Sequence, residues 1–123
     1  MTPCPAPTCQ PEASLQDLQR AISYVRANAS ELNVDANRIG VMGFSAGAHL
    51  AVMASTSFNK RMYLVNNAID QVSCRPNFCL LIYPAYLDGE HFGLAPEIQI
   101  APKTPPTMLI QTEDDRSFIN SSP

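Results

Sequence analysis

The sequence predicts an α/β fold in which a parallel sheet forms the core and helices flank it. Three short apolar runs, at residues 38–42, 78–83 and 107–111, have the composition of buried strands. The segments between them are helical or long, as the crossover between parallel strands requires. We therefore expect a sheet that is covered on both faces.

The first segment of the chain divides into a leader and a helix. Residues 1–13 are rich in proline and lack periodicity, which predicts a loose leader without structure of its own. Ser14 offers an N-cap, and the helix is expected from Ser14 to about Glu31. Apolar residues recur through this range at helical spacing: Leu15, Leu18, Ile22, Val25 and Leu32. Residues 33–37 are expected to form a turn.

The strongest chemical signal is the pentapeptide 43–47, Gly-Phe-Ser-Ala-Gly, between the expected strand Arg38–Met42 and an expected buried helix, Ala48–Ser55. A nucleophilic serine needs an exposed hydroxyl, a nearby base and donors for the developing oxyanion. A tight turn from strand to helix exposes Ser45 and points the amide of Ala46 toward the oxyanion. Ser45 is therefore the candidate nucleophile and Ala46 a candidate oxyanion donor.

Two further strands are expected after a polar stretch, residues 57–77. The run Phe78–Tyr83 is stopped by Pro84 and is typical of a buried strand. A long connection rich in proline follows, and Thr107–Gln111 forms the last apolar run. It ends in the acidic cluster Glu113–Asp115, which is also typical of a solvated loop or a helix start.

Several separated segments resemble the α/β hydrolases, and within them the small esterases that include enzymes like acetyl xylan esterases and feruloyl esterases. They are residues 15–22, 38–51, 75–76, 81–86, 104–107 and 111–115. The resemblance runs from about Leu15 to the C-terminus. It implies a partial α/β-hydrolase fold at residues 14–123.

The resemblance also implies a triad in the chain order serine, acid, histidine. Asp115 takes the place of the acid, because the family pattern of an aspartate, two further residues and then an apolar residue matches Asp115-Arg116-Ser117-Phe118. Asp114 is the alternative. The family's glycine-rich oxyanion segment has no counterpart upstream of Ser14, and no histidine follows Asp115. We therefore expect a fragment that lacks the N-terminal strands and the C-terminal histidine segment of the domain.

Neither histidine of the chain fits the base of the triad. His49 lies one helical turn past Ser45 and resembles a structural position of the family. His91 lies before the last strand, which gives the order serine, histidine, acid that this fold does not use. A loop histidine can still swing toward a nucleophile, so His91 stays an alternative.

Composition excludes several classes of partner. The formal net charge is −3 and the basic residues are scattered, so neither nucleic acid nor an anionic membrane is an expected partner.

No cofactor is expected. Cys4/Cys9 and Cys74/Cys79 are spaced too widely for a typical zinc site, and Cys79 is expected to pack as a small apolar residue. The chain has no signal peptide and is cytoplasmic as written, but a longer N-terminus would permit secretion, so the compartment stays open.

Together these observations predict a serine hydrolase of carboxylic esters, with a short-chain or carbohydrate-linked acyl ester as its small-molecule substrate. Two alternatives remain. One is an inactive hydrolase fragment or a binding module, which the missing base favours. The other is a serine peptidase, because the same triad serves both reactions and a fold does not fix a function.

Overall fold

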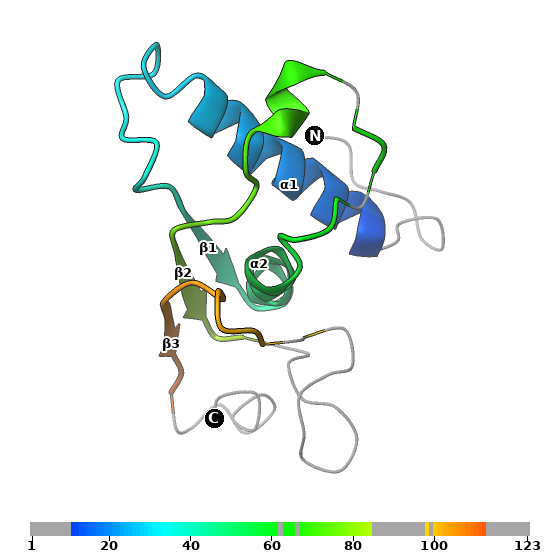
Figure 1. The fold of residues 1–123 in the computed structure, drawn as a ribbon. Helices are drawn as coiled ribbons and strands as arrows, with labels where there is room; N and C mark the ends of the chain where they lie inside the picture. The colour runs from blue at the N-terminus through cyan, green and yellow to red at the C-terminus, as the bar shows by residue number, and fades with distance from the viewer. Residues whose placement is uncertain (1–10, 62, 66, 85–97, 99, 113–123) are drawn as a thin grey trace, which may run out of the picture.

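A three-stranded parallel sheet forms one side of the structure, a computed structural model that describes residues 11–61, 63–65, 67–84, 98 and 100–112 (Figure 1). The strands are β1 (Gly40–Phe44), β2 (Phe78–Ile82) and β3 (Thr107–Ile110), and they lie in this order in the sheet. Phe44 pairs with Ile82, and Ile82 pairs with Ile110. The three carboxyl ends therefore meet at one edge, and the expected parallel sheet is confirmed.

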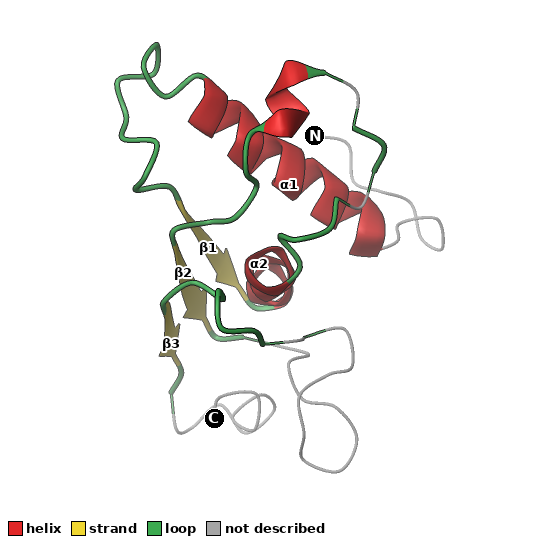
Figure 2. Cartoon of the chain, in the orientation of Figure 1, coloured by secondary structure: helices red, strands yellow, loops and turns green. Residues whose placement is uncertain are grey.

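Within the described residues, two α-helices and one short 3₁₀ helix accompany the sheet (Figure 2). Helix α2 (Ala46–Thr56) packs on β1 and β2, while α1 (Pro11–Ala27) packs on α2 and on η1 (Ala68–Gln71). The core combines apolar residues of α1, α2 and the strands, among them Leu15, Ile22, Val41, Ala51 and Leu81. Cys79 belongs to the same core, as expected.

The predicted boundaries of α1 were wrong at both ends. The helix begins at Pro11, so Ser14 lies inside it and is not the N-cap. A proline fits the first helical position because the N–H it lacks has no partner there. At the other end the helix stops at Ala27, and residues 28–33 continue as turns up to a left-handed residue, Asn33 (φ 58°), after which the Val34 N–H donates to the Ala29 carbonyl at 2.9 Å. This arrangement is typical of a helix C-terminus.

Only one face of the sheet is covered in the part of the chain that the structure describes. Val41, Cys79 and Leu81 point toward α2 and are buried. Alternate residues on the opposite face are exposed: Met42, Phe44, Phe78, Met108 and Ile110. The expectation of two covered faces is thus wrong for the described residues, because α1 packs on α2 and η1 and joins the core on the covered side.

A buried polar cluster fixes the connection between α2 and β2 onto α1. The Asp70 side chain is fully buried and pairs with Arg20 at 3.0 Å, while the Tyr63 hydroxyl donates to its carboxylate at 2.6 Å. Arg61 donates to the Ser23 hydroxyl (2.7 Å) and to the Asp70 carbonyl (3.0 Å). This polar stretch had no predicted element, yet the capping box from Asn67 to Asp70 starts η1 there.

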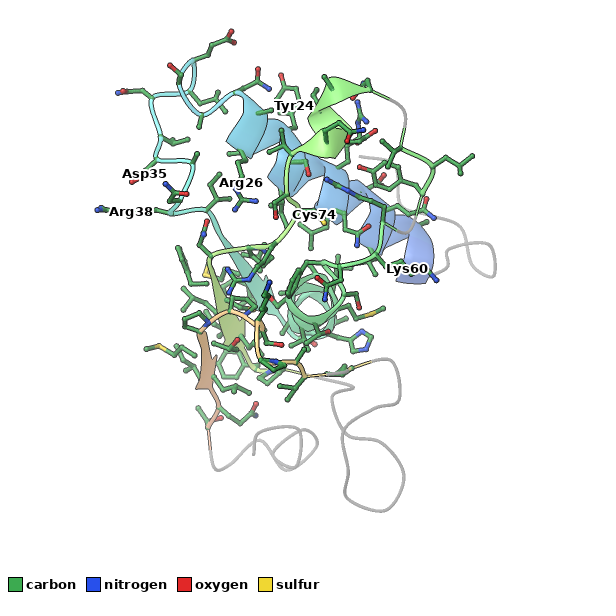
Figure 3. All side chains as sticks on the ribbon, viewed as in Figure 1. Tyr24, Arg26, Asp35, Arg38, Lys60 and Cys74 are labelled. Carbon is green, nitrogen blue, oxygen red and sulfur yellow. The ribbon has the colours of Figure 1, made fainter. Side chains whose placement is uncertain are left out.

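A second polar anchor lies at the amino end of the sheet. Arg26 of α1 lies between that helix and the segments that enter β1 and β2 (Figure 3). Its guanidinium donates to three backbone carbonyls and one amide oxygen: Ala36 (3.0 Å), Ser73 (2.5 Å), Arg75 (2.8 Å) and Asn77 Oδ1 (2.9 Å). Burial lowers the pKa of Arg26. Helix α1 therefore holds the strand entrances in place.

Candidate active site

The turn from β1 to α2 places Ser45 at the carboxyl edge of the sheet. Phe44 ends β1, Ala46 begins α2, and Ser45 between them has φ 53° and ψ −120°. This is the backbone conformation of the first central residue of a type II′ turn, a position that glycine dominates. A serine held there is strained, and such strain clusters at functional sites.

Hydrogen bonds on both sides hold this conformation. The Ser45 N–H donates to the Ile82 carbonyl at 3.1 Å, which continues the pairing of β1 with β2 by one residue. The Ser45 carbonyl accepts from the Ala48 N–H at 3.1 Å and so begins α2. The Ser45 side chain is exposed and makes no capping hydrogen bond to the helix.

The two glycines of the pentapeptide have different roles. A Cβ on Gly43 would overlap the Gly47 carbonyl and lie 2.6 Å from the Ala48 nitrogen, closer than real Cβ atoms come to other atoms. Gly43 is therefore the position where strand and helix backbones pass each other. A Cβ on Gly47 would meet no described atom within 4 Å.

The start of α2 supplies backbone donors beside Ser45. Ala46 is the first residue of the helix, so its N–H has no acceptor within the helix. The positive end of the helix dipole lies at the same place and favours negative charge. This geometry suits an oxyanion next to the Ser45 hydroxyl.

The strands beside β1 end in register with it. Tyr83 follows β2 and Gln111 follows β3, so both residues lie at the edge where Ser45 lies. Tyr83 also has a positive φ, 50°, which was not predicted. The sequence gives no sign of this conformation, because a residue before a proline favours an extended backbone.

The structure does not place every predicted site residue. Asp115, its alternative Asp114 and His91 lie outside the described residues. His49 lies in the second turn of α2 and is half-buried. Strand β3 runs parallel to β1, so its carboxyl end, from which the chain leads toward Asp115, is at the edge that carries Ser45.

The cysteines of the described region are core residues. Cys74 and Cys79 are both buried and neither forms a disulfide. Burial raises the pKa of each thiol. No group of three His, Cys, Asp or Glu side chains within the described ranges is arranged to hold a metal. The helices described here also include none that is long and apolar enough to span a bilayer.

A parallel sheet whose strand β1 leads through a strained serine turn into a helix defines the α/β-hydrolase class. Within this class the chain belongs to the BD-FAE family, whose model matches residues 6–79.

Solved and curated relatives agree with this assignment. The structure of an acetyl ester-xyloside bifunctional hydrolase from Caldicellulosiruptor lactoaceticus is 36% identical, has a TM-score of 0.70, and matches 85% of this chain and 45% of that protein. Endo-1,4-beta-xylanase B of Butyrivibrio fibrisolvens is 31% identical over 120 residues, 82% of this chain and 19% of that protein. An acetylxylan esterase of Xylanibacter ruminicola is 29% identical over 123 residues, 81% of this chain and 23% of that protein. The chain thus spans about a fifth of the length of these two curated relatives.

Proposed function

We propose that the protein is a serine hydrolase of carboxylic esters and that Ser45 is its nucleophile. The observation that carries this proposal is the Ser45 turn, with φ 53°, an exposed side chain and a place at the carboxyl edge of a parallel sheet. A strained and exposed serine at this position is what nucleophilic attack on a carbonyl needs.

In the proposed reaction the Ser45 Oγ attacks the ester carbonyl carbon and its proton passes to a general base. The oxyanion accepts a hydrogen bond from the Ala46 N–H, and the alcohol leaves with a proton from the protonated base. Water then adds to the acyl-serine, which releases the carboxylic acid and restores Ser45. Asp115 is proposed to orient the base, because β3 leads toward the edge that carries Ser45.

The proposal assigns the base to neither histidine of this chain. His49 belongs to the helix that starts at Ser45, and its position four residues on fits a structural role. The substrate class is proposed to be acyl esters of small alcohols or carbohydrates, which the acetyl ester and acetylxylan hydrolases among the relatives support.

Hydrolysis of 4-nitrophenyl acetate by the full-length gene product tests this proposal. Ser45→Ala should lower kcat by about 10³-fold or more, since it removes the nucleophile. Ser30→Ala is the matched control, because Ser30 is an exposed serine just beyond α1, away from the β1–α2 turn. An active Ser45→Ala variant would refute the proposal.

A second measurement addresses the base. The 123-residue chain by itself should have negligible activity, because no base activates Ser45. Saturable turnover by this chain that Ser45→Ala abolishes would contradict that expectation. In that case His91→Ala should remove activity, while His49→Ala should mainly lower stability.

A further inference from the structure

A second strained residue lies next to Ser45. Because Phe44 pairs with Ile82, the residues that follow them, Ser45 and Tyr83, lie at the adjacent ends of neighbouring strands. The hydrogen bond from the Ser45 N–H to the Ile82 carbonyl, at 3.1 Å, fixes this arrangement. Neighbouring strands are about 4.8 Å apart, so the Tyr83 backbone lies one strand spacing from the candidate nucleophile.

The conformation of Tyr83 is unfavourable on two counts. Its φ of 50° is rare for a bulky residue, and a following proline disfavours everything except an extended backbone. The surrounding structure nevertheless enforces it. The Tyr83 N–H donates to the Ile110 carbonyl at 2.9 Å, and the Pro84 side chain is fully buried.

Tyr83 is exposed although the alternation along β2 predicts that it is buried. Alternation along β2 would put the Tyr83 side chain on the covered face with Cys79 and Leu81. The left-handed turn instead leaves Tyr83 44% exposed at the carboxyl edge. Ligands of open α/β sheets bind at this edge, so the fold holds an aromatic ring in a strained conformation where a substrate would lie.

We propose that Tyr83 is a substrate-contacting residue whose ring packs against the sugar that carries the ester. This inference rests on the proposed function. A pyranose presents an apolar C–H face, and a rigid aromatic ring offers a large contact area at a low cost in conformational entropy. An alkyl alcohol offers no such face, so the contact distinguishes sugar esters from simple esters.

The test compares two acetate esters with the full-length gene product: acetylated xylobiose and ethyl acetate. For Tyr83→Asn the ratio of kcat/KM for the sugar ester to that for ethyl acetate should fall about tenfold, mainly through KM, because one aromatic contact is lost. Asparagine tolerates a positive φ, so the turn is kept. Tyr83→Phe should restore the ratio, because it keeps the ring.

The matched control is Tyr24→Asn. Tyr24 is also an exposed tyrosine, 52% exposed, but it lies on α1 and away from the sheet (Figure 3). This variant should leave the ratio unchanged.

Each outcome separates the contact from the proposed function. Equal losses on both esters would overturn the contact and show that Tyr83 only shapes the turn. An unchanged ratio in Tyr83→Asn would overturn it as well, while ester hydrolysis that depends on Ser45 would still stand. If the Ser45→Ala variant still hydrolyses esters, the proposed function is refuted, and the inference about Tyr83 is refuted with it.

Discussion

The two glycines that flank Ser45 should respond in opposite ways to the same substitution. Gly43→Ala would bring a Cβ within 2.6 Å of the Ala48 nitrogen and into the Gly47 carbonyl, whereas ordinary contacts begin at 3.4 Å. The strand and the helix must therefore separate by at least 0.8 Å (3.4 − 2.6 Å) to clear the Ala48 nitrogen, and by more to clear the Gly47 carbonyl. Both clashing groups are backbone, so no side chain can rotate to relieve the overlap.

The cost of Gly43→Ala follows from this geometry. Overpacking a tight site typically costs about 1 to 3 kcal/mol, and an overlap with two rigid backbone groups belongs at the upper end. At about 2 to 4 °C per kcal/mol, 3 kcal/mol lowers Tm by about 6 to 12 °C. Gly47→Ala should raise stability by about 0.5 to 1 kcal/mol, because Gly47 is helical, has no positive φ and has open space where its Cβ would lie.

Thermal unfolding of the two variants of the full-length gene product checks this prediction. Gly40→Ala is a second control, because the Cβ there would meet only the Phe78 ring, which is exposed and can move. Equal losses at Gly43 and Gly47, or a Gly43→Ala variant as stable as the wild type, would refute the argument from backbone contact.

Three further predictions concern strain, the buried charge and the thiols. Ser45→Gly should be about 1 kcal/mol more stable than Ser45→Ala in chemical denaturation, because glycine adopts φ 53° and ψ −120° without strain. Equal stabilities of the two variants would show that the backbone at residue 45 is not strained. Asp70→Asn should lower stability by about 1 to 3 kcal/mol, because the buried carboxylate accepts hydrogen bonds from Arg20 and the Tyr63 hydroxyl and the amide replaces one of its acceptor oxygens by a donor; an unchanged stability would contradict this. Cys74 and Cys79 have raised pKa values in the folded protein, so the fold favours their neutral thiols. Their contribution to the free energy of unfolding is fully present below the ordinary thiol pKa and is lost as the pH rises through the raised values. The free energy of unfolding should therefore fall above about pH 9. This pH dependence should shrink in Cys79→Ala, and an unchanged dependence would exclude Cys79 as its source.

The strands and the site turn were predictable because their signals are local. The apolar run before Ser45 and the alanine-rich run after it correctly placed β1 and α2 around the turn, although β1 extends to Phe44 and α2 begins at Ala46. The start of α1 was predicted at the wrong residue because Ser14 and Pro11 are both suitable starts and only packing decides between them. The open face of the sheet does not follow from the apolar runs themselves, which are similar in strands buried on one face or on both, but it is what the expected fragment of a larger domain would leave uncovered.

Tyr83 is the clearest case of information that the sequence does not carry. The residue pair Tyr83-Pro84 suggests the end of a strand and an extended backbone, and the sequence gives no reason to expect a positive φ. The conformation depends on a hydrogen bond to Ile110 of β3 and on the burial of Pro84. It is therefore a property of the assembled sheet.

The same dependence applies to Ser45. Its pentapeptide is contiguous, but the hydrogen bond that holds its N–H comes from Ile82 of β2, a strand distant in sequence. A serine with φ 53° is strained in isolation, so a short peptide with these five residues would not keep the turn. Substitutions in β2 that weaken its pairing with β1 should therefore reduce the reactivity of Ser45, although they leave the pentapeptide itself unchanged. The strained turn at Ser45 therefore depends on both β1 and β2, and the pentapeptide alone does not suffice.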